Sequence, residues 1–223
     1  MRRLLTLLPV LVLVLTPAAR AAELTIVVDE GERGVHWGES HQINGTLTSD
    51  GRTPLAGQQV VLQGRPFPFD APFEQLATAT TAANGTFTFK TELTRNTKLR
   101  TFAPALGTRS KQVTAHLFPA THLSFRQLRP GVVRITQDYR VPRSARLGGK
   151  TLFYVAPRNA RTSRINRLAK TRRVSPGRFR ARVTVKIPDS YGGHFRYAAC
   201  YRYSPGSGLG DPKISCPRSG YRF

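Results

Sequence analysis

The chain has few of the residues on which most reaction chemistry depends. Its 223 residues include two cysteines, one methionine, one tryptophan and five histidines, and the histidines are scattered. It contains no Gly-x-Ser-x-Gly or His-Glu-x-x-His motif, so neither a nucleophile elbow nor a zinc-protease site is expected. No metal-ligand spacing or cofactor motif is present. These absences favour a protein that is not an enzyme and has no cofactor.

Acidic residues are almost missing from one half of the chain. Residues 22–118 contain nine Lys and Arg and nine Asp and Glu, whereas residues 119–223 contain 23 Lys and Arg and three acids, a net charge of +20. The three acids are widely separated in sequence, which argues against paired-carboxylate glycosidase chemistry there. Arginine supplies 19 of the 23 cations, and its guanidinium group suits bidentate contact with phosphate, sulfate or carboxylate. A half this basic is expected to attract polyanions.

Residues 1–21 have the pattern of a secretory signal peptide. Arg2 and Arg3 form a basic start, residues 4–15 are apolar, and Ala19 to Ala21 supply a small-x-small cleavage site. The arginine pair leaves both general and twin-arginine export open. No later apolar run is long enough to span a bilayer, so we expect a secreted or cell-surface protein with no transmembrane segment in the mature chain.

The two cysteines, Cys200 and Cys216, favour a disulfide bond. Export places them in an oxidising compartment, and an even count fits pairing. A metal site would need more ligands, and only His194 lies nearby in sequence. We therefore predict a Cys200–Cys216 bridge.

An internal repeat indicates two similar units. With the chain shifted by 92 residues, Gly57 falls on Gly149, Leu76 on Leu168 and Gly85 on Gly177, and the apolar positions between them agree. We therefore predict two domains, residues 22–118 and 119–223.

Each unit has the pattern of β-structure. In residues 178–187 the apolar side chains fall on every second position, from Phe179 to Ile187, as in a half-buried strand. Asn84-Gly85 and Pro176-Gly177 are matching turns before such strands. Short strands with Gly and Pro between them predict an all-β protein made of two tandem β-sandwiches.

The first unit carries landmarks that resemble a known family. Residues 38–47, the Pro54-Leu55-Ala-Gly57 turn before Val60 to Leu62, and the Thr-rich strand before Asn84-Gly85 follow a recurring rhythm. This rhythm resembles the bacterial immunoglobulin-like modules of secreted actinobacterial proteins, and it is similar to the prealbumin-like, carboxypeptidase-regulatory modules. The resemblance covers about 75 residues. It implies an immunoglobulin-like sandwich for the first unit, and such modules serve as spacers, adhesion units or carbohydrate-proximal appendages. The second unit departs from the pattern because it lacks the Pro-Leu turn, so its tandem immunoglobulin-like fold is expected from the repeat.

The basic residues of the second unit are expected to form an anion-binding hairpin. We predict a loop over residues 158–163, then a strand that pairs with residues 178–187 through the Ser-Pro-Gly turn, so that their cations share one ribbon. Side chains two apart on a strand are about 6.6–7 Å apart, close to the spacing of charges along an extended polyanion. The predicted anion-binding residues are Arg164, Arg167, Lys170, Arg172, Arg173, Arg178, Arg180, Arg182 and Lys186.

The charge does not identify the partner. Wall polymers, extracellular nucleic acid, acidic polysaccharide and anionic lipid all carry suitable groups. Solvated charge without a partner is another interpretation, and a spacer or adhesion module with a protein partner is the alternative function. Gly206 to Gly210 resembles a phosphate loop superficially but lacks its Lys-Ser/Thr ending, so we predict a flexible hairpin tip there.

Overall fold

The computed structural model describes residues 21–29, 35–203 and 205–211. The signal-peptide prediction, apart from Ala21, and Cys216 lie outside these residues, so the signal peptide and the disulfide stay predictions. The described residues form four antiparallel β-sheets, one two-stranded parallel pairing and three short 3₁₀ turns, with no α-helix, which confirms the all-β prediction. No helix among them is long and apolar enough to cross a membrane.

The N-terminal half packs two sheets face to face over one hydrophobic core. In the first sheet, β4 pairs with β1, β2, β5 and β8. In the second, β6 pairs with β7 and β9, and β9 also pairs with β10 and β11. The strands are β1 (Ala22–Leu24), β2 (Val27–Asp29), β3 (Val35–His36), β4 (His41–Ser49), β5 (Thr53–Pro54), β6 (Gln59–Pro66), β7 (Glu74–Thr80), β8 (Thr86–Thr91), β9 (Thr97–Ala103), β10 (Thr108–Arg109), β11 (Val113–Ala115) and β12 (Leu117–Phe118), with the 3₁₀ turn η1 (Pro104–Leu106).

The C-terminal half has a second core between the sheets β13-β14-β18-β17 and β16-β15-β19. Its central pairings match those of the first half, because β14 pairs with β18 as β4 pairs with β8, and β15 lies between β16 and β19 as β6 lies between β7 and β9. The strands are β13 (Ala120–Arg129), β14 (Val132–Arg140), β15 (Lys150–Pro157), β16 (Ile165–Lys170), β17 (Arg172–Ser175), β18 (Arg178–Lys186) and β19 (Phe195–Tyr201), with the 3₁₀ turns η2 (Asp189–Tyr191) and η3 (Pro205–Ser207).

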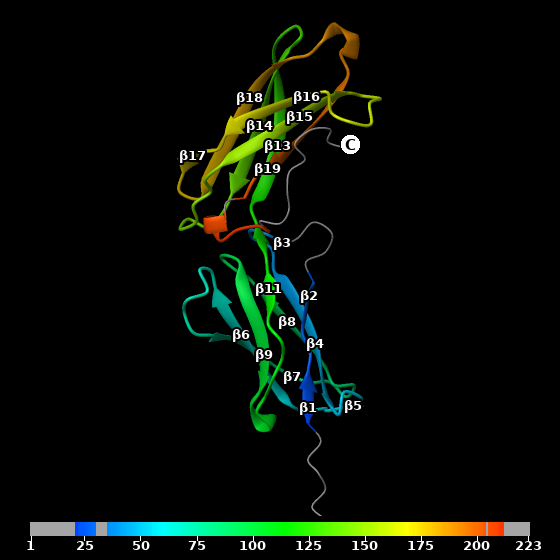
Figure 1. The fold of residues 1–223 in the computed structure, drawn as a ribbon, viewed down its shortest axis with the longest axis vertical. Helices are drawn as coiled ribbons and strands as arrows, with labels where there is room; N and C mark the ends of the chain where they lie inside the picture. The colour runs from blue at the N-terminus through cyan, green and yellow to red at the C-terminus, as the bar shows by residue number, and fades with distance from the viewer. Residues whose placement is uncertain (1–20, 30–34, 204, 212–223) are drawn as a thin grey trace, which may run out of the picture.

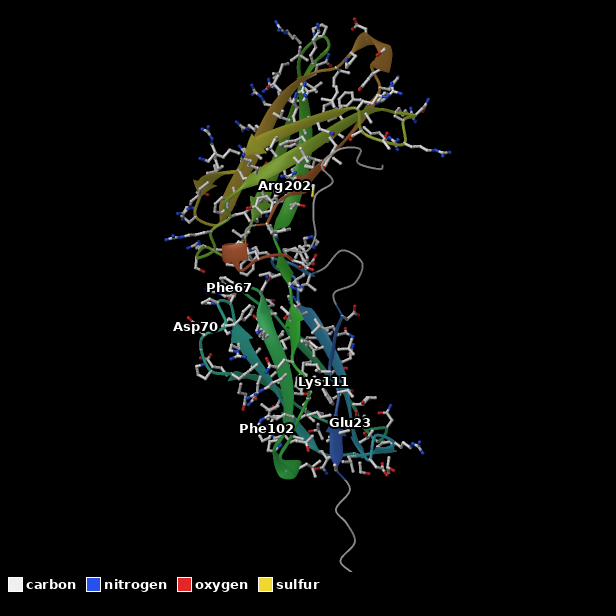
Figure 2. All side chains as sticks on the ribbon, in the orientation of Figure 1. Glu23, Phe67, Asp70, Phe102, Lys111 and Arg202 are labelled. Carbon is white, nitrogen blue, oxygen red and sulfur yellow. The ribbon has the colours of Figure 1, made fainter. Side chains whose placement is uncertain are left out.

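The two halves are stacked end to end along the longest axis of the molecule (Figure 1). Short strand β12 leaves the first half and pairs in parallel with β3 at the junction. Phe67, labelled in Figure 2, lies at the end of the first half that faces the second. The junction is therefore made by main-chain pairing as well as by side-chain contact.

The glycine-rich segment 206–210 is part of this junction, so its prediction as a flexible tip is wrong. Gly208, Leu209 and Gly210 are buried. The carbonyl of Gly208 accepts a hydrogen bond from the Asn96 N–H (2.7 Å), and the Gly210 N–H donates to the Leu117 carbonyl (2.8 Å). Gly208 and Gly210 have φ of 66° and 64°, and a Cβ would come within 2.8 Å of the Phe67 ring and 2.3 Å of the Tyr203 ring, respectively. Only glycine fits this docking.

A chain of hydroxyl groups crosses the second core. The Tyr139 hydroxyl is 2.7 Å from Thr151 Oγ1, which is 2.9 Å from Thr171 Oγ1. Burial raises the pKa of Tyr139 well above its usual range, although the bond to Thr151 opposes this, and burial also raises the pKa of Tyr201 and Tyr203. These three phenols stay protonated in the folded chain at pH values where an exposed tyrosine ionises.

This burial predicts a loss of stability at alkaline pH. Above about pH 10 the tyrosines lose protons in the unfolded chain but keep them when folded, so the free energy of unfolding falls with rising pH. Each contributes up to about 1.4 kcal/mol per pH unit. Urea unfolding followed by circular dichroism at several alkaline pH values measures the slope, and Tyr139→Phe should reduce it by removing one group. An unchanged slope in this variant would contradict the assignment.

Candidate anion-binding face

Strand β18 places alternate cations on the outer side of its sheet. Phe179, Ala181 and Val185 are buried, while the residues between them are exposed or half-buried. This confirms the period-two pattern predicted for residues 178–187. The cations of this strand that point outward are Arg178, Arg180, Arg182 and Lys186.

Strands β13 and β14 extend the same surface, which the sequence interpretation missed. Arg134 and Arg140 alternate with buried Val133, Ile135 and Tyr139 on β14. The signal was available, because residues 132–141 alternate as regularly as residues 178–187. We call the outer side of the sheet the basic face, and its cations are Arg126, Arg134, Arg140, Arg172, Arg178, Arg180, Arg182 and Lys186.

Register places like charges directly opposite each other on the basic face. Arg126 faces Arg134, Arg140 faces Arg178, and Arg172 faces Arg180 across neighbouring strands. A fourth such pair, Lys150 and Lys170, lies on the other sheet of the same half. Directly opposed like charges destabilise a sheet. The fold therefore carries repulsion here that a bound anion would relieve.

One carboxylate lies on the basic face. Asp138 Oδ1 accepts a hydrogen bond from Arg180 Nε at 2.5 Å, and both side chains are about one-third exposed. The other seven cations of the face form no ion pair with the residues that the structure describes. Asp138 therefore offsets one charge and leaves the rest of the face open to an external anion. Many nitrogen-tipped side chains project from this half in Figure 2.

The predicted hairpin is wrong in its first strand. β16 pairs with β15 in the opposite sheet, so of the two strands β16 and β17 only β17 pairs with β18. Arg164 precedes β16, while Arg167 and Lys170 lie on it, so these three are not part of the ribbon. The chain changes sheets at Thr171, whose side chain is buried and bonded to Thr151 and whose N–H donates to the Gly149 carbonyl (3.0 Å).

The change of sheet nevertheless brings several predicted residues together again. Edge strands β16 and β17 lie at the same open side of the sandwich, and the groove between them is lined by cations from both sheets. Arg173, whose register partner is the inward-facing Phe179, is exposed at this edge. The predicted cations that line the groove are Lys170, Arg172, Arg173, Arg180 and Arg182.

Cations in the N-terminal half are arranged differently. Among the described residues of this half, one like-charge pair lies opposed, Arg65 and Lys98. Arg65 Cζ lies 4.5 Å from the centre of the Phe73 ring, and Lys98 Nζ lies 5.0 Å from the centre of the Phe69 ring. Arg100 also lies over Phe73 at 4.0 Å. All the cation–ring contacts that the described residues make with one another lie in this half. The first half thus stabilises its cations internally.

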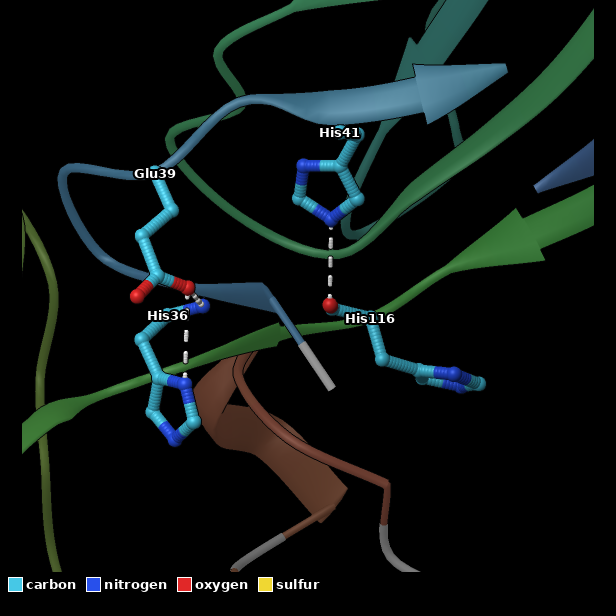
Figure 3. A network of polar contacts seen from close by, with 4 residues as sticks. All are labelled: His36, Glu39, His41 and His116. Atoms are coloured by element: carbon cyan, nitrogen blue, oxygen red, sulfur yellow. Dashed lines mark hydrogen bonds and ion pairs between the residues drawn. The ribbon is translucent and has the colours of Figure 1, made fainter. Parts of the chain in front are cut away.

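Three histidines near the junction take part in two separate polar contacts, neither of which joins two histidine rings (Figure 3). His36 Nδ1 is 3.6 Å from a Glu39 oxygen that also accepts the His36 N–H, and the buried His41 Nε2 is 3.1 Å from the His116 carbonyl. Among the described residues no group of three or more His, Cys, Asp or Glu side chains could hold a metal ion. The first contact is local in sequence, whereas the second joins residues 75 apart.

The fold and the face define an all-β protein of the sandwich type with one strongly basic half. No protein-family model matches the chain, and no curated protein matches it. Among solved structures it is similar to Salmonella alpha-2-macroglobulin, with a TM-score of 0.33 and 16% identity for a mutant, and 0.31 and 18% for the methylamine-reacted protein. Each superposition covers 87% of this chain and 14% of the other, so the chain spans about a seventh of those proteins. The likeness is distant.

Proposed function

We propose that the chain is an exported, non-enzymatic protein of the cell envelope whose C-terminal half binds an anionic polymer or surface. It consists of two tandem immunoglobulin-like domains, residues 22–118 and 119–223, and is secreted or held at the cell surface. The basic face and the adjoining groove are the binding surface. The predicted signal peptide and the Cys200–Cys216 bridge fit an oxidising compartment.

The observation that carries this proposal is the opposition of cations across the strands. A protein that needs charge only for solubility can place its cations beside acids or apart from one another. Here three cation pairs face each other on one sheet, where each pair costs stability, and one carboxylate accompanies them. A polyanion that runs across the sheet would lie close to both members of each pair and turn repulsion into attraction.

The proposal is tested by reversing charge on the basic face. The chain from Ala22 onwards is titrated into fluorescent polyphosphate and heparin at several NaCl concentrations. Affinity should fall steeply with salt, by about 10³-fold or more between about 50 and 200 mM if six or more phosphates are contacted. Arg172→Glu with Arg182→Glu should weaken binding at low salt and flatten the salt dependence, because fewer counterions are released.

The matched control makes the same charge change in the first half. Lys90 and Lys111 are exposed there, and Lys111 is labelled in Figure 2. Lys90→Glu with Lys111→Glu should leave affinity nearly unchanged. An equal loss in both variants would mean that only net charge matters, and the absence of salt-sensitive binding in the parent chain would overturn the proposal.

A spacer or adhesion role with a protein partner is the second candidate. The end-to-end stacking of the halves and the buried junction segment give a rod-like shape suited to holding a partner away from a surface (Figure 1). This function is favoured if envelope association survives Arg172→Glu with Arg182→Glu.

A further inference from the structure

The open side of the second sandwich opposite the groove holds an aromatic cleft. Edge strands β13 and β19 face each other there and leave a cleft of about 650 Å³. Phe125, Phe195 and Tyr197 line it, and Phe125 is 52% exposed. The exposed Phe125 ring and the half-buried Phe195 and Tyr197 rings form one contiguous aromatic patch in a concave surface, a combination that marks ligand-binding grooves.

The three rings form one cluster with a fixed geometry. Phe125 contacts Phe195 and Tyr197 edge-on, with centroid separations of 5.7 and 5.3 Å. Phe195 and Tyr197 are 6.1 Å apart on the same side of β19. Edge-on packing holds Phe125 in place from the core side while half of its surface stays in solvent. It is thus a pre-positioned platform for a flat ligand.

Cations, one carboxylate and backbone contacts surround this platform, since Asp189 also lines the cleft. Arg158 and His194 are exposed at the rim, and the Arg158 N–H donates to the His194 carbonyl at 3.3 Å. The Arg196 guanidinium donates to the Ala160 carbonyl, which ties the same loop to β19. The rim therefore combines positive charge with a loop held at two points.

The cleft joins the basic face across a single strand. Arg126 and Phe125 are neighbours on β13, so their side chains point to opposite sides of that edge strand. Arg126 lies opposite Arg134 on the basic face, and Phe125 lies opposite the buried Ile135 on the core side. A polymer crossing the β13 edge would meet a cation and an aromatic ring within one residue of each other.

We infer that the anionic polymer is a single-stranded nucleic acid, with a base stacked on Phe125 and the neighbouring phosphates on Arg126 and the basic face. This inference rests on the proposed function. Proteins that bind single strands without sequence preference combine a cationic track with aromatic rings on which bases stack. Polyphosphate and lipid headgroups supply the charge but no flat ring, and a paired duplex hides its base faces. None of these three ligands would stack on Phe125.

The experiment separates stacking from charge. Binding of the chain from Ala22 onwards is measured by fluorescence anisotropy with oligothymidylate and with an abasic oligonucleotide of equal length. Phe125→Ala should weaken oligothymidylate binding about 5- to 150-fold and leave the abasic strand unchanged. Phe125→Trp should restore binding by retaining the ring. Leu106→Ala, which shortens an apolar side chain of the first half that is 41% exposed, is the matched control and should have no effect.

The outcomes distinguish base stacking on Phe125 from the proposed binding of anions by the basic face. Equal affinity for the two strands in the parent chain would overturn base stacking while leaving anion binding intact. A loss of heparin affinity in Phe125→Ala equal to that for oligothymidylate would identify a sugar ring as the ligand and would also overturn it. If neither strand, heparin nor polyphosphate binds the parent chain, the proposed function itself fails.

Discussion

Replacing Asn96 with alanine is expected to lower the free energy of unfolding by about 2–6 kcal/mol, because two buried backbone groups would each lose a partner. Asn96 lies at the junction and is buried. Its Nδ2 donates to the Gly210 carbonyl at 2.7 Å, and its Oδ1 accepts from the Leu117 N–H at 2.9 Å. The Asn96 side chain thus bridges the backbone of Leu117, at the end of the first half, and the backbone of Gly210, in the segment that follows the second half.

The same change should weaken the coupling between the halves. Each half has its own core, and the hydrogen bonds of Asn96 join them. Differential scanning calorimetry should show one transition for the parent chain and a broadened or double transition for Asn96→Ala. Asn159→Ala, at an exposed position, is the matched control. A single transition at an unchanged temperature in Asn96→Ala would show that the junction does not depend on this side chain.

The junction shows what the sequence could not predict. Glycine-rich runs are typical of mobile loops, and segment 206–210 fits that pattern. Its actual partner, Asn96, is 114 residues from Gly210. Nothing local to the segment indicates that its carbonyls are buried, so the prediction failed through a long-range contact.

Most of the basic face has a signal in the sequence. Period-two alternation predicts the outward cations of β18, and equal alternation over residues 132–141 identifies Arg134 and Arg140 in the same way. The assignment of Arg167 and Lys170 could not be corrected in this way. The pattern of residues 165–175 predicts one continuous strand. The change of sheet at Thr171 depends on the Thr151 hydroxyl, which also bonds Tyr139 and which only the folded core brings close.

Arg178→Glu is expected to stabilise the fold while weakening its binding to polyanions. Arg178 lies directly opposite Arg140 on β14, so glutamate would replace a repulsive pair with an attractive one, a gain of roughly 0.5–1 kcal/mol. The same change removes a cation and sets a negative charge against the ligand, which should reduce affinity at low salt by about tenfold or more. Urea unfolding and titration with fluorescent polyphosphate measure the two effects on one variant.

A gain in stability together with a loss of affinity would distinguish an arginine that serves binding from one that only adds charge. A merely solvated arginine could be replaced at no cost to function, and a structural arginine would lower stability when replaced. Lys90→Glu on β8, the strand equivalent to β18, faces the uncharged Gln42 and should change neither quantity. Arg178→Gln should have a free energy of unfolding and a polyphosphate affinity between those of the parent chain and Arg178→Glu. A variant that is more stable and still binds fully would show that the opposed cations do not serve a ligand.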